Sequence, residues 1–394
     1  MISVEQALAE CLALVAPLPM ETVPLAQTCG RYMPQPATAT RDQPPFAASA
    51  MDGYAVQGDP APGDRFTVVG EAGAGHAWQG TLGPLQAARI FTGAPLPAGA
   101  TRVIIQEDVT RDGDIVTVAE GADSGPHIRP AGQDSRAGDT LSPRLLRPND
   151  LALLASMNIA LVPVTRRPVV AIIATGDELV MPGDTPGPDQ IIASNSFTLK
   201  ALAEQAGAEV RLLPIARDTI ESLTYVLGLA QDADIIITTG GASVGDHDLV
   251  AQVAENLGMQ RAFWKIAMRP GKPLMAGRLG NAAMLGLPGN PVSSVVCAHL
   301  FLLPMIRAAL GLPADAIAPR PRLAVLTQDT GPTGPRAHYM RATLTQTDGL
   351  PQITPFDRQD SSLLSILSSA DALLIRPAGD GPRAAGETVS FLPI

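Results

Sequence analysis

In the middle of the chain, apolar runs typical of β-strands alternate with segments whose apolar residues have helical spacing. Short runs of apolar, β-branched residues occur at 169–174, 209–215 and 234–239, and each is typical of a buried strand. Apolar positions at helical spacing follow at 196–206 and 249–257, and a glycine ends each run. Strands that alternate with helices predict a doubly wound parallel sheet, and ligands bind such sheets at the carboxyl ends of the strands.

Capping residues indicate where some helices begin. Residues 3–16 predict a helix in which Ser3 is the N-cap and Gln6 completes a capping box. Asp218 and Glu221 have the same spacing. They predict the start of the helix that lies between the second and third of the buried strands.

A longer apolar helix is predicted at 292–310. Asn290 is a good N-cap and Pro291 a good first helical residue, so this helix start is also available to an anion. Pro304 should kink the helix. Its serine, histidine, proline and arginine residues argue against a membrane span.

The rest of the chain reads mainly as strands. Residues 57–120 carry short strand signals separated by Gly and Pro, which predicts a small β domain. The runs 273–279 and 282–287 flank Gly-Asn and predict a hairpin. Residues 319–394 predict a separate β-rich domain with one helix at 361–369.

Composition and charge argue against several classes of protein. Net charge is −10, which argues against nucleic acid or an anionic membrane as the main partner. Cys11, Cys29 and Cys297 are far apart and form no metal-binding pattern, which favours a reducing compartment. The N-terminus is amphipathic and acidic rather than a signal peptide. A soluble cytoplasmic protein is expected.

The loop after the third strand is the strongest candidate site. Gly240 and Gly241 let backbone N–H groups approach an anion, and a helix start with partial positive charge follows. Asp246 and Asp248 stand beside this loop, and a carboxylate next to a phosphate needs a cation between them, so Mg²⁺ is expected. Either aspartate could instead cap the helix. His247 between them makes a transition-metal site conceivable, although a lone histidine is more often just a loop residue.

Charged residues elsewhere could complete this site. Glu178 follows the first strand and therefore falls at the same sheet edge. Lys265, Arg269 and Lys272 supply a local basic cluster, for which a solvated turn is an equal alternative.

Two glycine-containing stretches lie near the predicted β domain. Asp52-Gly53 reads as a tight turn before a strand, for which a plain hairpin is the favoured interpretation. Thr92-Gly93 begins a rigid proline-containing turn that could be an ordinary surface feature.

Taken together, these motifs resemble the molybdopterin molybdenumtransferase family, which includes bacterial MoeA and the C-terminal part of gephyrin. Each stretch is weak alone, but their order along almost the whole chain is a strong signal. The matching stretches are SAMDGYAV (49–56), IFTGAPLPAGA (90–100), VIIQEDV (103–109), IRPAGQDSRAGD (128–139), IIATGDEL (172–179), IIASNSFTL (191–199), IITTGGASVGDHD (236–248), FWKIAMRPGKPLMAG (263–277) and LGLPGNPVSSVV (285–296).

The resemblance implies a multi-domain, elongated α/β-plus-β chain that forms a homodimer. It implies a discontinuous helical domain (1–21 and 136–165), a β-rich domain (22–135), an α/β molybdopterin-binding domain (166–315) and a C-terminal β-rich domain (319–394). The active cleft would lie between the α/β domain of one subunit and the β-rich domain of the other.

The resemblance also implies a reaction, in which adenylylated molybdopterin and molybdate give molybdenum cofactor and AMP with the help of Mg²⁺. The implied catalytic residues are Asp52, Glu178, Asp218 and Asp248, and Glu178 and Asp248 would hold the metal. The implied substrate-binding residues are Thr92, Asp134, Gly240, Gly241, Ser243, Lys265, Arg269, Lys272, Pro288, Asn290 and Pro291. The family often has Lys where this chain has Arg269. The compact ammonium charge of lysine is thereby replaced by the planar guanidinium group of arginine.

Two other functions compete with this one. The α/β segment alone resembles the molybdopterin adenylyltransferases, although the MDGYAV and TGAP stretches go with the insertase. A non-enzymatic scaffold that binds cofactor intermediates is the third reading, and the intact set of carboxylates weighs against it. Contacts with the adenylyltransferase or with recipient molybdoenzymes, and a preference for tungstate, are left open by the sequence.

Overall fold

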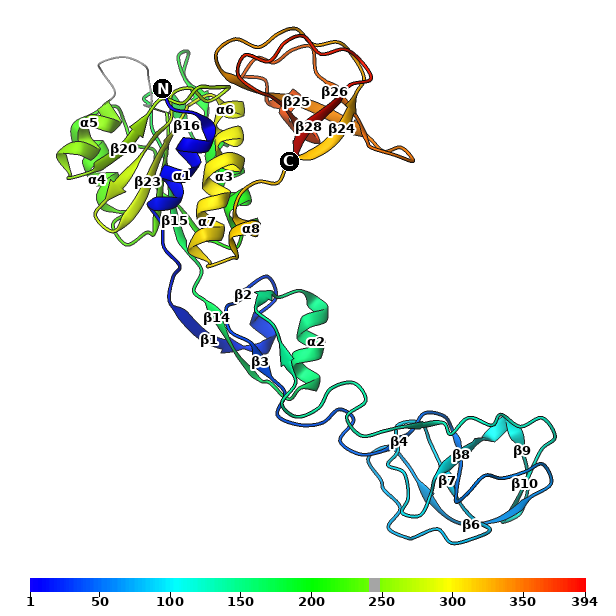
Figure 1. The fold of residues 1–394 in the computed structure, drawn as a ribbon. Helices are drawn as coiled ribbons and strands as arrows, with labels where there is room; N and C mark the ends of the chain where they lie inside the picture. Colours follow the sequence, from blue (N-terminus) through cyan, green and yellow to red (C-terminus); the bar gives the residue numbers. More distant parts are fainter. Residues whose placement is uncertain (241–248) are drawn as a thin grey trace. The chain divides into compact units, whose positions relative to one another are not determined.

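The protein is described by a computed structural model that covers residues 1–240 and 249–394. Its chain forms two compact units (Figure 1). Unit 1 comprises residues 1–21, 30–34 and 164–394, and unit 2 comprises residues 22–29 and 35–163. The finer division into four domains stays a prediction.

A six-stranded mixed sheet forms the centre of unit 1, in the order β18-β15-β19-β23-β22-β20. The first four strands are parallel, and β22 and β20 extend the sheet as antiparallel strands. Both the parallel sheet and the hairpin predicted from the sequence are therefore confirmed. The bounds are β15 Val169–Ala174, β18 Glu209–Leu212, β19 Ile235–Thr239, β20 Gln260–Trp264, β22 Met275–Leu279 and β23 Ala282–Leu287.

Alternate residues of the central strands enter two different cores. Ile172 and Ile237 belong to the core that also contains Leu199 and Phe301, whereas Ile173 and Ile236 belong to the core that contains Leu223 and Val253. This follows from the strand period of two, and it explains why these strands are mostly apolar. The helices involved are α3 Asn195–Gln205, α4 Ile220–Gly228, α5 Leu249–Asn256, α6 Pro291–Cys297 and α7 Leu303–Ala309.

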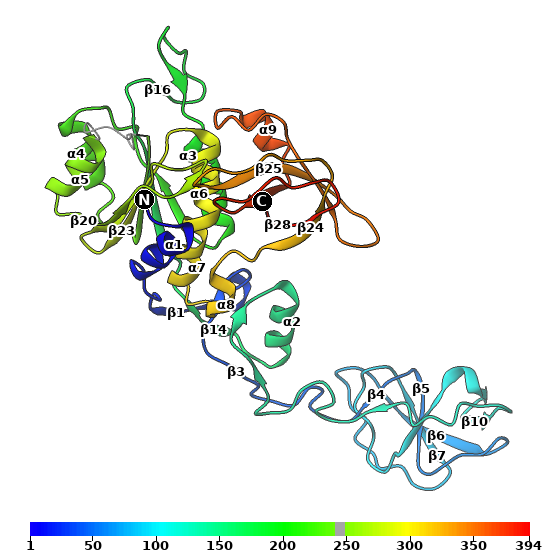
Figure 2. The same ribbon diagram turned by 45° about the horizontal axis from the view of Figure 1, so that its top comes forward.

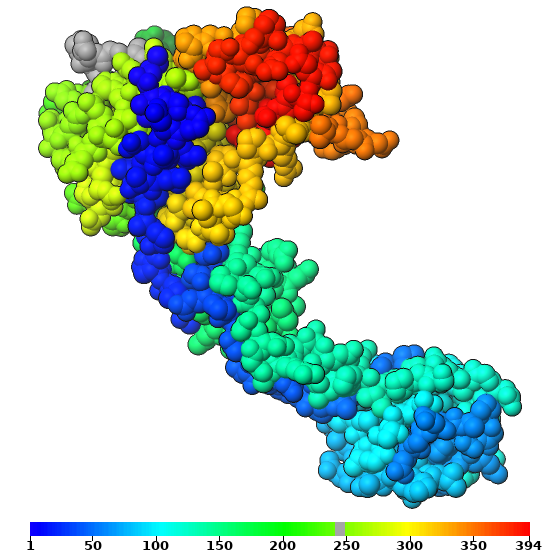
Figure 3. All heavy atoms as spheres, in the orientation of Figure 1, coloured from blue at the N-terminus to red at the C-terminus, as the bar shows by residue number. Residues whose placement is uncertain are grey.

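The N-terminal helix α1, Val4–Ala13, belongs to unit 1. Ser3 and Gln6 form the predicted capping box, with both bonds present at 3.0 and 3.2 Å. Ala7 and Cys11 are fully buried in the core that contains Ile172. Figure 3 shows this segment, in blue, lying across the surface of the α/β part.

The predicted capping box at Asp218 and Glu221 is wrong. Thr219 is the N-cap of α4, and its hydroxyl accepts the Ser222 N–H at 3.1 Å. The Asp218 backbone N–H instead donates to the Asp177 carboxylate at 3.1 Å. Asp218 is therefore held by a contact 41 residues away, and the helix begins one residue later than expected.

The long apolar helix spans Pro291–Ala309 and contains a π-helical segment, η3, at Ala298–Leu302. The Leu303 N–H donates to the carbonyl of Ala298, five residues back, just before Pro304. Proline has no N–H and clashes with the carbonyl four residues back, so a widened turn accommodates the disturbance expected there. The segment is long and apolar enough to cross a membrane, but 83% of it is buried inside the structure, which is typical of a core helix.

The C-terminal residues of unit 1 form a second six-stranded sheet, in the order β21-β25-β26-β24-β28-β27. An additional pairing of β25 with β27 closes five of these strands into a barrel, and closure removes exposed sheet edges. Helix α9, Leu364–Ser368, is shorter than the predicted helix and lies near α6 (Figure 2). The strands are β21 Met268–Arg269, β24 Arg322–Leu326, β25 Ala337–Thr345, β26 Gln352–Pro355, β27 Ala372–Arg376 and β28 Thr388–Pro393.

Unit 2 contains the predicted β domain as a six-stranded sheet in the order β8-β5-β7-β6-β10-β9. Gly53 is required in β5 because a Cβ at this position would lie 1.9 Å from the carbonyl oxygen of Ile104 on β8. The sheet strands are β5 Gly53–Val56, β6 Arg65–Ala72, β7 Gln86–Ile90, β8 Arg102–Ile105, β9 Val109–Asp112 and β10 Ile115–Val118.

Shorter elements complete the chain. Helix α2, Pro148–Ser156, belongs to unit 2. The short strands are β1 Met20–Pro24, β2 Tyr32–Met33, β3 Ala37–Thr38, β4 Ala48–Ser49, β11 Ile128–Arg129, β12 Thr140–Leu141, β13 Arg144–Leu145, β14 Leu161–Thr165, β16 Leu179–Val180 and β17 Ile191–Ile192, and the short helices are η1 Leu25–Gln27, η2 Gln106–Asp108 and α8 Ala314–Ile317.

A buried ion-pair network stabilises the barrel. The Arg376 side chain is 1% exposed, and its Nε lies 2.6 Å from the Asp380 carboxylate, which also accepts from Arg383 Nη2 at 2.7 Å. Hydrogen bonding and charge from Arg383, and then from Arg376, lower the pKa of Asp380 from 3.8 to about 2.

We predict that Asp380→Asn destabilises the barrel at pH 7, because it leaves the Arg376 guanidinium buried without its counter-charge. Removing one partner of a buried pair typically costs about 3 kcal/mol or more. Since the folded-state pKa of Asp380 is depressed, this stability is present above the ordinary carboxyl pKa and is lost as pH falls from about 4 toward 2. Urea unfolding between pH 3 and 7 measures the change.

Asp348→Asn is the matched control, because Asp348 is an exposed residue of the same barrel. Equal unfolding midpoints for the two variants at pH 7 would contradict the role assigned to the Asp380 network.

Candidate functional site

A cavity of about 570 Å³ lies at the carboxyl ends of β15 and β19 in unit 1. The structure brings four residues of the predicted site together there, namely Glu178, Gly240, Asn290 and Pro291. The complete lining is Ala174, Thr175, Glu178, Leu179, Ile191, Ile192, Ala193, Ser194, Asn195, Ser196, Thr239, Gly240, Gly289, Asn290, Pro291 and Ser362.

Close backbone approach fixes the floor of this cavity. Gly240 has a φ of +95°, and a Cβ at this position would lie 2.4 Å from the carbonyl oxygen of Thr175. A Cβ on Gly289 would lie 3.4 Å from the Gly240 Cα. The strand ends can meet at this distance because position 240 is glycine, whereas a side chain at position 289 would make only an ordinary van der Waals contact with Gly240.

Hydrogen bonds from Arg217 hold the turn that carries Glu178. Gly176 has a φ of +144°, and a Cβ there would lie 2.3 Å from the Glu178 carboxylate. Arg217 Nη1 donates to the carbonyl oxygens of Asp177 at 3.0 Å and Leu179 at 3.1 Å. Arg217 was not a predicted site residue, and no local sequence signal marks it, because its partners are about 40 residues away.

Asn195 is a second residue that the sequence analysis missed as a site residue. Its amide donates to the carbonyl oxygen of Gly289 at 2.7 Å, while the Ser294 hydroxyl donates to the carbonyl oxygen of Pro288. These bonds fix the Pro288–Pro291 turn. The predicted N-cap Asn290 occupies the N-cap position of α6, although its side chain makes no capping bond.

The C-terminal barrel contributes to the same cavity. Ser362 lines the cavity, and the Val292 N–H at the start of α6 donates to the carbonyl oxygen of Ser361 at 3.1 Å. The cavity is therefore bounded by the α/β sheet, its loops and one loop of the barrel, all of which belong to unit 1.

The predicted basic residues do not line this cavity. Lys265 and Lys272 lie on one loop, where the Ile266 N–H donates to the Lys272 carbonyl at 3.0 Å. Lys265 has a φ of +74°, and its Nζ lies 5.1 Å from the centre of the Trp264 ring. Arg269 is on β21, in register with His338 of β25. Asp218 and Pro288 also lie outside the lining.

In unit 2, Asp52 and Thr92 form a direct pair. The Thr92 backbone N–H donates to Asp52 Oδ1 at 2.7 Å, and the Thr92 hydroxyl donates to the same oxygen at 2.8 Å. These hydrogen bonds lower the pKa of the Asp52 carboxyl, with a smaller contribution from the charge of Arg89. The Asp52 and Thr92 turns, which are 40 residues apart in the sequence, are thus joined by an ionised carboxylate.

Asp134 is not part of that pair. It is exposed and lines a separate cavity of about 320 Å³ in unit 2, together with Leu153 and Met157. The described residues give no contact between Asp134 and Asp52.

Several predicted residues lie outside the described part of the chain: Gly241, Ser243, Asp246, His247 and Asp248. Within residues 1–240 and 249–394, no group of three or more His, Cys, Asp or Glu side chains is placed to hold a metal ion. Glu178 is the acidic residue that lines the cavity there, so the metal site at Glu178 and Asp248 stays a prediction.

Comparisons with known proteins cover nearly the whole chain. Residues 2–158 match the MoeA N-terminal region (domain I and II), residues 171–308 match a probable molybdopterin binding domain, and residues 324–394 match the MoeA C-terminal region (domain IV). Molybdopterin molybdenumtransferase 2 of Mycobacterium tuberculosis (strain H37Rv) is 37% identical, covering 95% of this chain and 94% of its own. Molybdopterin molybdenumtransferase of Bacillus subtilis (strain 168) is 35% identical, covering 95% and 90%.

A solved structure agrees with these sequence relatives. The molybdopterin biosynthesis MoeA protein from Pyrococcus horikosii is similar with a TM-score of 0.83 and 29% identity, covering 100% of this chain and 99% of its own. The family resemblance and the multi-domain fold predicted from the sequence motifs are thereby confirmed. The chain is a member of the MoeA family of molybdopterin molybdenumtransferases.

Proposed function

We propose that this chain is an enzyme of molybdenum cofactor biosynthesis that transfers molybdenum to molybdopterin. The observation that carries the proposal is the cavity at the ends of β15 and β19, where Glu178, Gly240 and the Pro288–Pro291 turn meet. Relatives that share 35–37% identity over nearly the full chain carry the name of this activity. A volume of about 570 Å³ is in the range of small-molecule sites.

The substrate we propose is adenylylated molybdopterin, with molybdate as co-substrate and AMP as the released product. Parallel-sheet proteins bind ligands at this edge of the sheet, and Gly240 lines the cavity there. The Pro288–Pro291 turn, which Asn195 and Ser294 hold in place, would form the opposite wall against the substrate.

Mg²⁺ is the cofactor we propose, bound by Glu178 and Asp248 together with substrate oxygens. Mg²⁺ is commonly bound through one or two protein carboxylates and substrate phosphates, and Glu178 provides one such carboxylate in the cavity lining. When bound, this ion neutralises phosphoanhydride charge. Arg217 fixes the carbonyls on either side of Glu178, so the backbone that carries the Glu178 side chain is held in place.

The basic residues would hold substrate, whereas Asp52 and Asp218 stay proposed catalytic residues. Lys265, Arg269 and Lys272 would attract molybdate or phosphate groups. Asp52 and Thr92 form a rigid pair in unit 2. From the family resemblance we propose a homodimer in which this pair completes the site of the other subunit. Contacts with the adenylyltransferase that supplies the substrate, and with recipient molybdoenzymes, belong to the same proposal.

The purified protein should release AMP from adenylylated molybdopterin only when both Mg²⁺ and molybdate are present. Chromatography of AMP and of the pterin product measures this, and samples without molybdate or with a chelator serve as controls. If the protein instead makes adenylylated molybdopterin from ATP and molybdopterin, it is an adenylyltransferase. If it binds the pterin and catalyses neither reaction, it is a scaffold.

Glu178→Gln should slow single-turnover AMP release by on the order of 100-fold, because it removes a charge that acts in the transition state. Binding of adenylylated molybdopterin should change little, since glutamine keeps the shape and one acceptor oxygen. Glu221→Gln, an exposed glutamate on α4, is the matched control and should leave both quantities unchanged.

Lys272→Ala tests a role in anion binding, in contrast to the catalytic role that Glu178→Gln tests. If the basic residues position anions, this change raises the concentration of molybdate or pterin needed while turnover at saturation is kept.

A Glu178→Gln protein with normal turnover would remove Glu178 from the catalytic residues, and one that fails to bind pterin would make it a binding residue.

The shared site predicts complementation between two inactive variants. Asp52→Ala removes the acceptor of both Thr92 donors, and Asp248→Ala removes a proposed metal ligand of the other part of the site. Random mixing of a two-fold dimer would restore about a quarter of wild-type activity, because half of the dimers would contain one intact site. Absence of recovery after demonstrated subunit exchange, for example by mass spectrometry, would rule out a site shared between subunits.

A further inference from the structure

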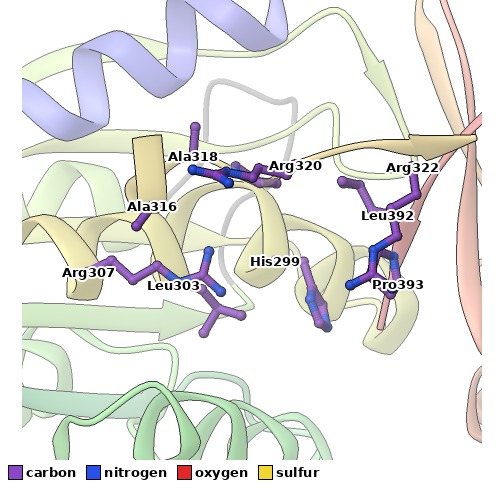
Figure 4. A pocket seen from close by; sticks show the side chains of 10 residues that line it. His299, Leu303, Arg307, Ala316, Ala318, Arg320, Arg322, Leu392 and Pro393 are labelled. Carbon is purple, nitrogen blue, oxygen red and sulfur yellow. The ribbon is translucent and has the colours of Figure 1, made fainter. Parts of the chain in front are cut away.

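A second cavity, of about 510 Å³, lies within unit 1 on a different face from the candidate active site. It is bounded by the helix Pro291–Ala309, by the segment that follows it and by two strands of the barrel (Figure 4). The two cavities share no lining residue. Its lining is His299, Leu303, Arg307, Ala316, Ala318, Pro319, Arg320, Arg322, Leu392 and Pro393.

One face of the helix provides three of these side chains. His299, Leu303 and Arg307 are spaced four residues apart, so they lie one above the other on the helix surface. Arg322 begins β24 and is paired in register with Phe391 of β28, which continues into Leu392 and Pro393. Figure 4 shows His299 and Arg307 on the helix and Arg322 on the barrel side of the same cavity.

The cavity carries cationic groups without acidic partners. Arg307 is partly buried, and its guanidinium donates to the carbonyl oxygen of Ile317 at 3.3 Å. Within the described residues, neither Arg307 nor Arg322 forms an ion pair. Arg320 differs, because it is bonded to the Asp315 carboxylate at 2.6 Å. Two unpaired guanidinium charges, beside the paired Arg320, thus face a lining in which the described part of the chain places no aspartate or glutamate.

Arg307 is a partly buried charge without a carboxylate partner among the described residues, whereas Arg322 is exposed. A charge that is partly removed from water is costly unless it is paired, and guanidinium groups match the oxygens of phosphate with two parallel hydrogen bonds. Burial, and then the charge of Arg307, lower the pKa of His299 to about 4. His299 is therefore neutral at pH 7, where it can donate one hydrogen bond without adding charge.

The other walls are apolar. Leu303, Leu392 and Pro393 lie on two sides, and Ala316, Ala318 and Pro319 belong to the connecting segment. Inorganic phosphate alone would leave these surfaces in contact with water. An organic group attached to the anion would cover them and gain free energy from the buried apolar area.

We propose that this cavity binds the dianion of an organic phosphate monoester, with its phosphate between Arg307 and Arg322 and its organic group against Leu303, Leu392 and Pro393. A phosphate monoester carries close to two negative charges at neutral pH, which matches the two unpaired guanidinium groups. This site lies beyond the proposed reaction and does not depend on it.

Phenyl phosphate is the probe, because it combines a dianion with a compact apolar group. Isothermal titration calorimetry of the full chain at low ionic strength should show binding of phenyl phosphate, with weaker binding of inorganic phosphate and no measurable binding of phenol. Arg322→Gln should weaken the binding of phenyl phosphate by about tenfold or more, since it removes a charge-assisted hydrogen bond. Arg307→Gln should have a similar effect.

Arg358→Gln is the matched control, because Arg358 is an exposed arginine of the same barrel outside the cavity. Its affinity for phenyl phosphate should equal that of the unchanged protein. Arg322 is exposed, so its replacement tests the proposal even if Arg307→Gln fails to fold. Three results would overturn the proposal: absence of phenyl phosphate binding, binding that Arg322→Gln does not weaken, or inorganic phosphate binding as tightly as the ester.

Discussion

Burial of the central parallel strands on both faces is the constraint on which the α/β part depends. Every residue of β19 is buried, and its three successive isoleucines, 235–237, enter opposite cores in turn. The first three residues of this strand are isoleucines and its last two are buried threonines, and ligands of parallel sheets bind beyond the point where such strands end. Gly240 stands at that point, and its contact with Thr175 requires the absence of a side chain. Packing of the core thus determines where the candidate site lies.

Sequence patterns predicted these elements well because their causes are local. The strand 169–174 agrees with β15, and the hairpin around Gly280 agrees with β22 and β23. The start of α4 was predicted wrongly because Asp218 and Thr219 are both good N-caps, and only a bond from Asp177 decides between them. Local spacing cannot contain a contact that is formed between segments 41 residues apart.

The residues of the candidate site likewise fall into two groups, those that local sequence predicted and those that it did not. Glu178 and Gly240 were predicted because each follows a strand, and both line the cavity. Arg217 and Asn195 were not predicted, because their bonds to the Leu179 and Gly289 carbonyls exist only after the sheet has formed. The residues that position the site are therefore harder to find in the sequence than the residues that line it. The roles of the lining residues stay predictions that chemical tests must decide.

Charge pairing separates structural arginines from arginines available to a ligand. In the barrel, Arg376 is almost fully buried and has the Asp380 carboxylate as its partner, so its charge is used for stability. Arg307 is partly buried and has only a backbone carbonyl of the described residues at hydrogen-bonding distance. A carbonyl dipole compensates a guanidinium charge less completely than a carboxylate does. Among the described residues no carboxylate pairs with Arg307, and this difference is the reason for proposing that an anion from solution completes its environment in the second cavity.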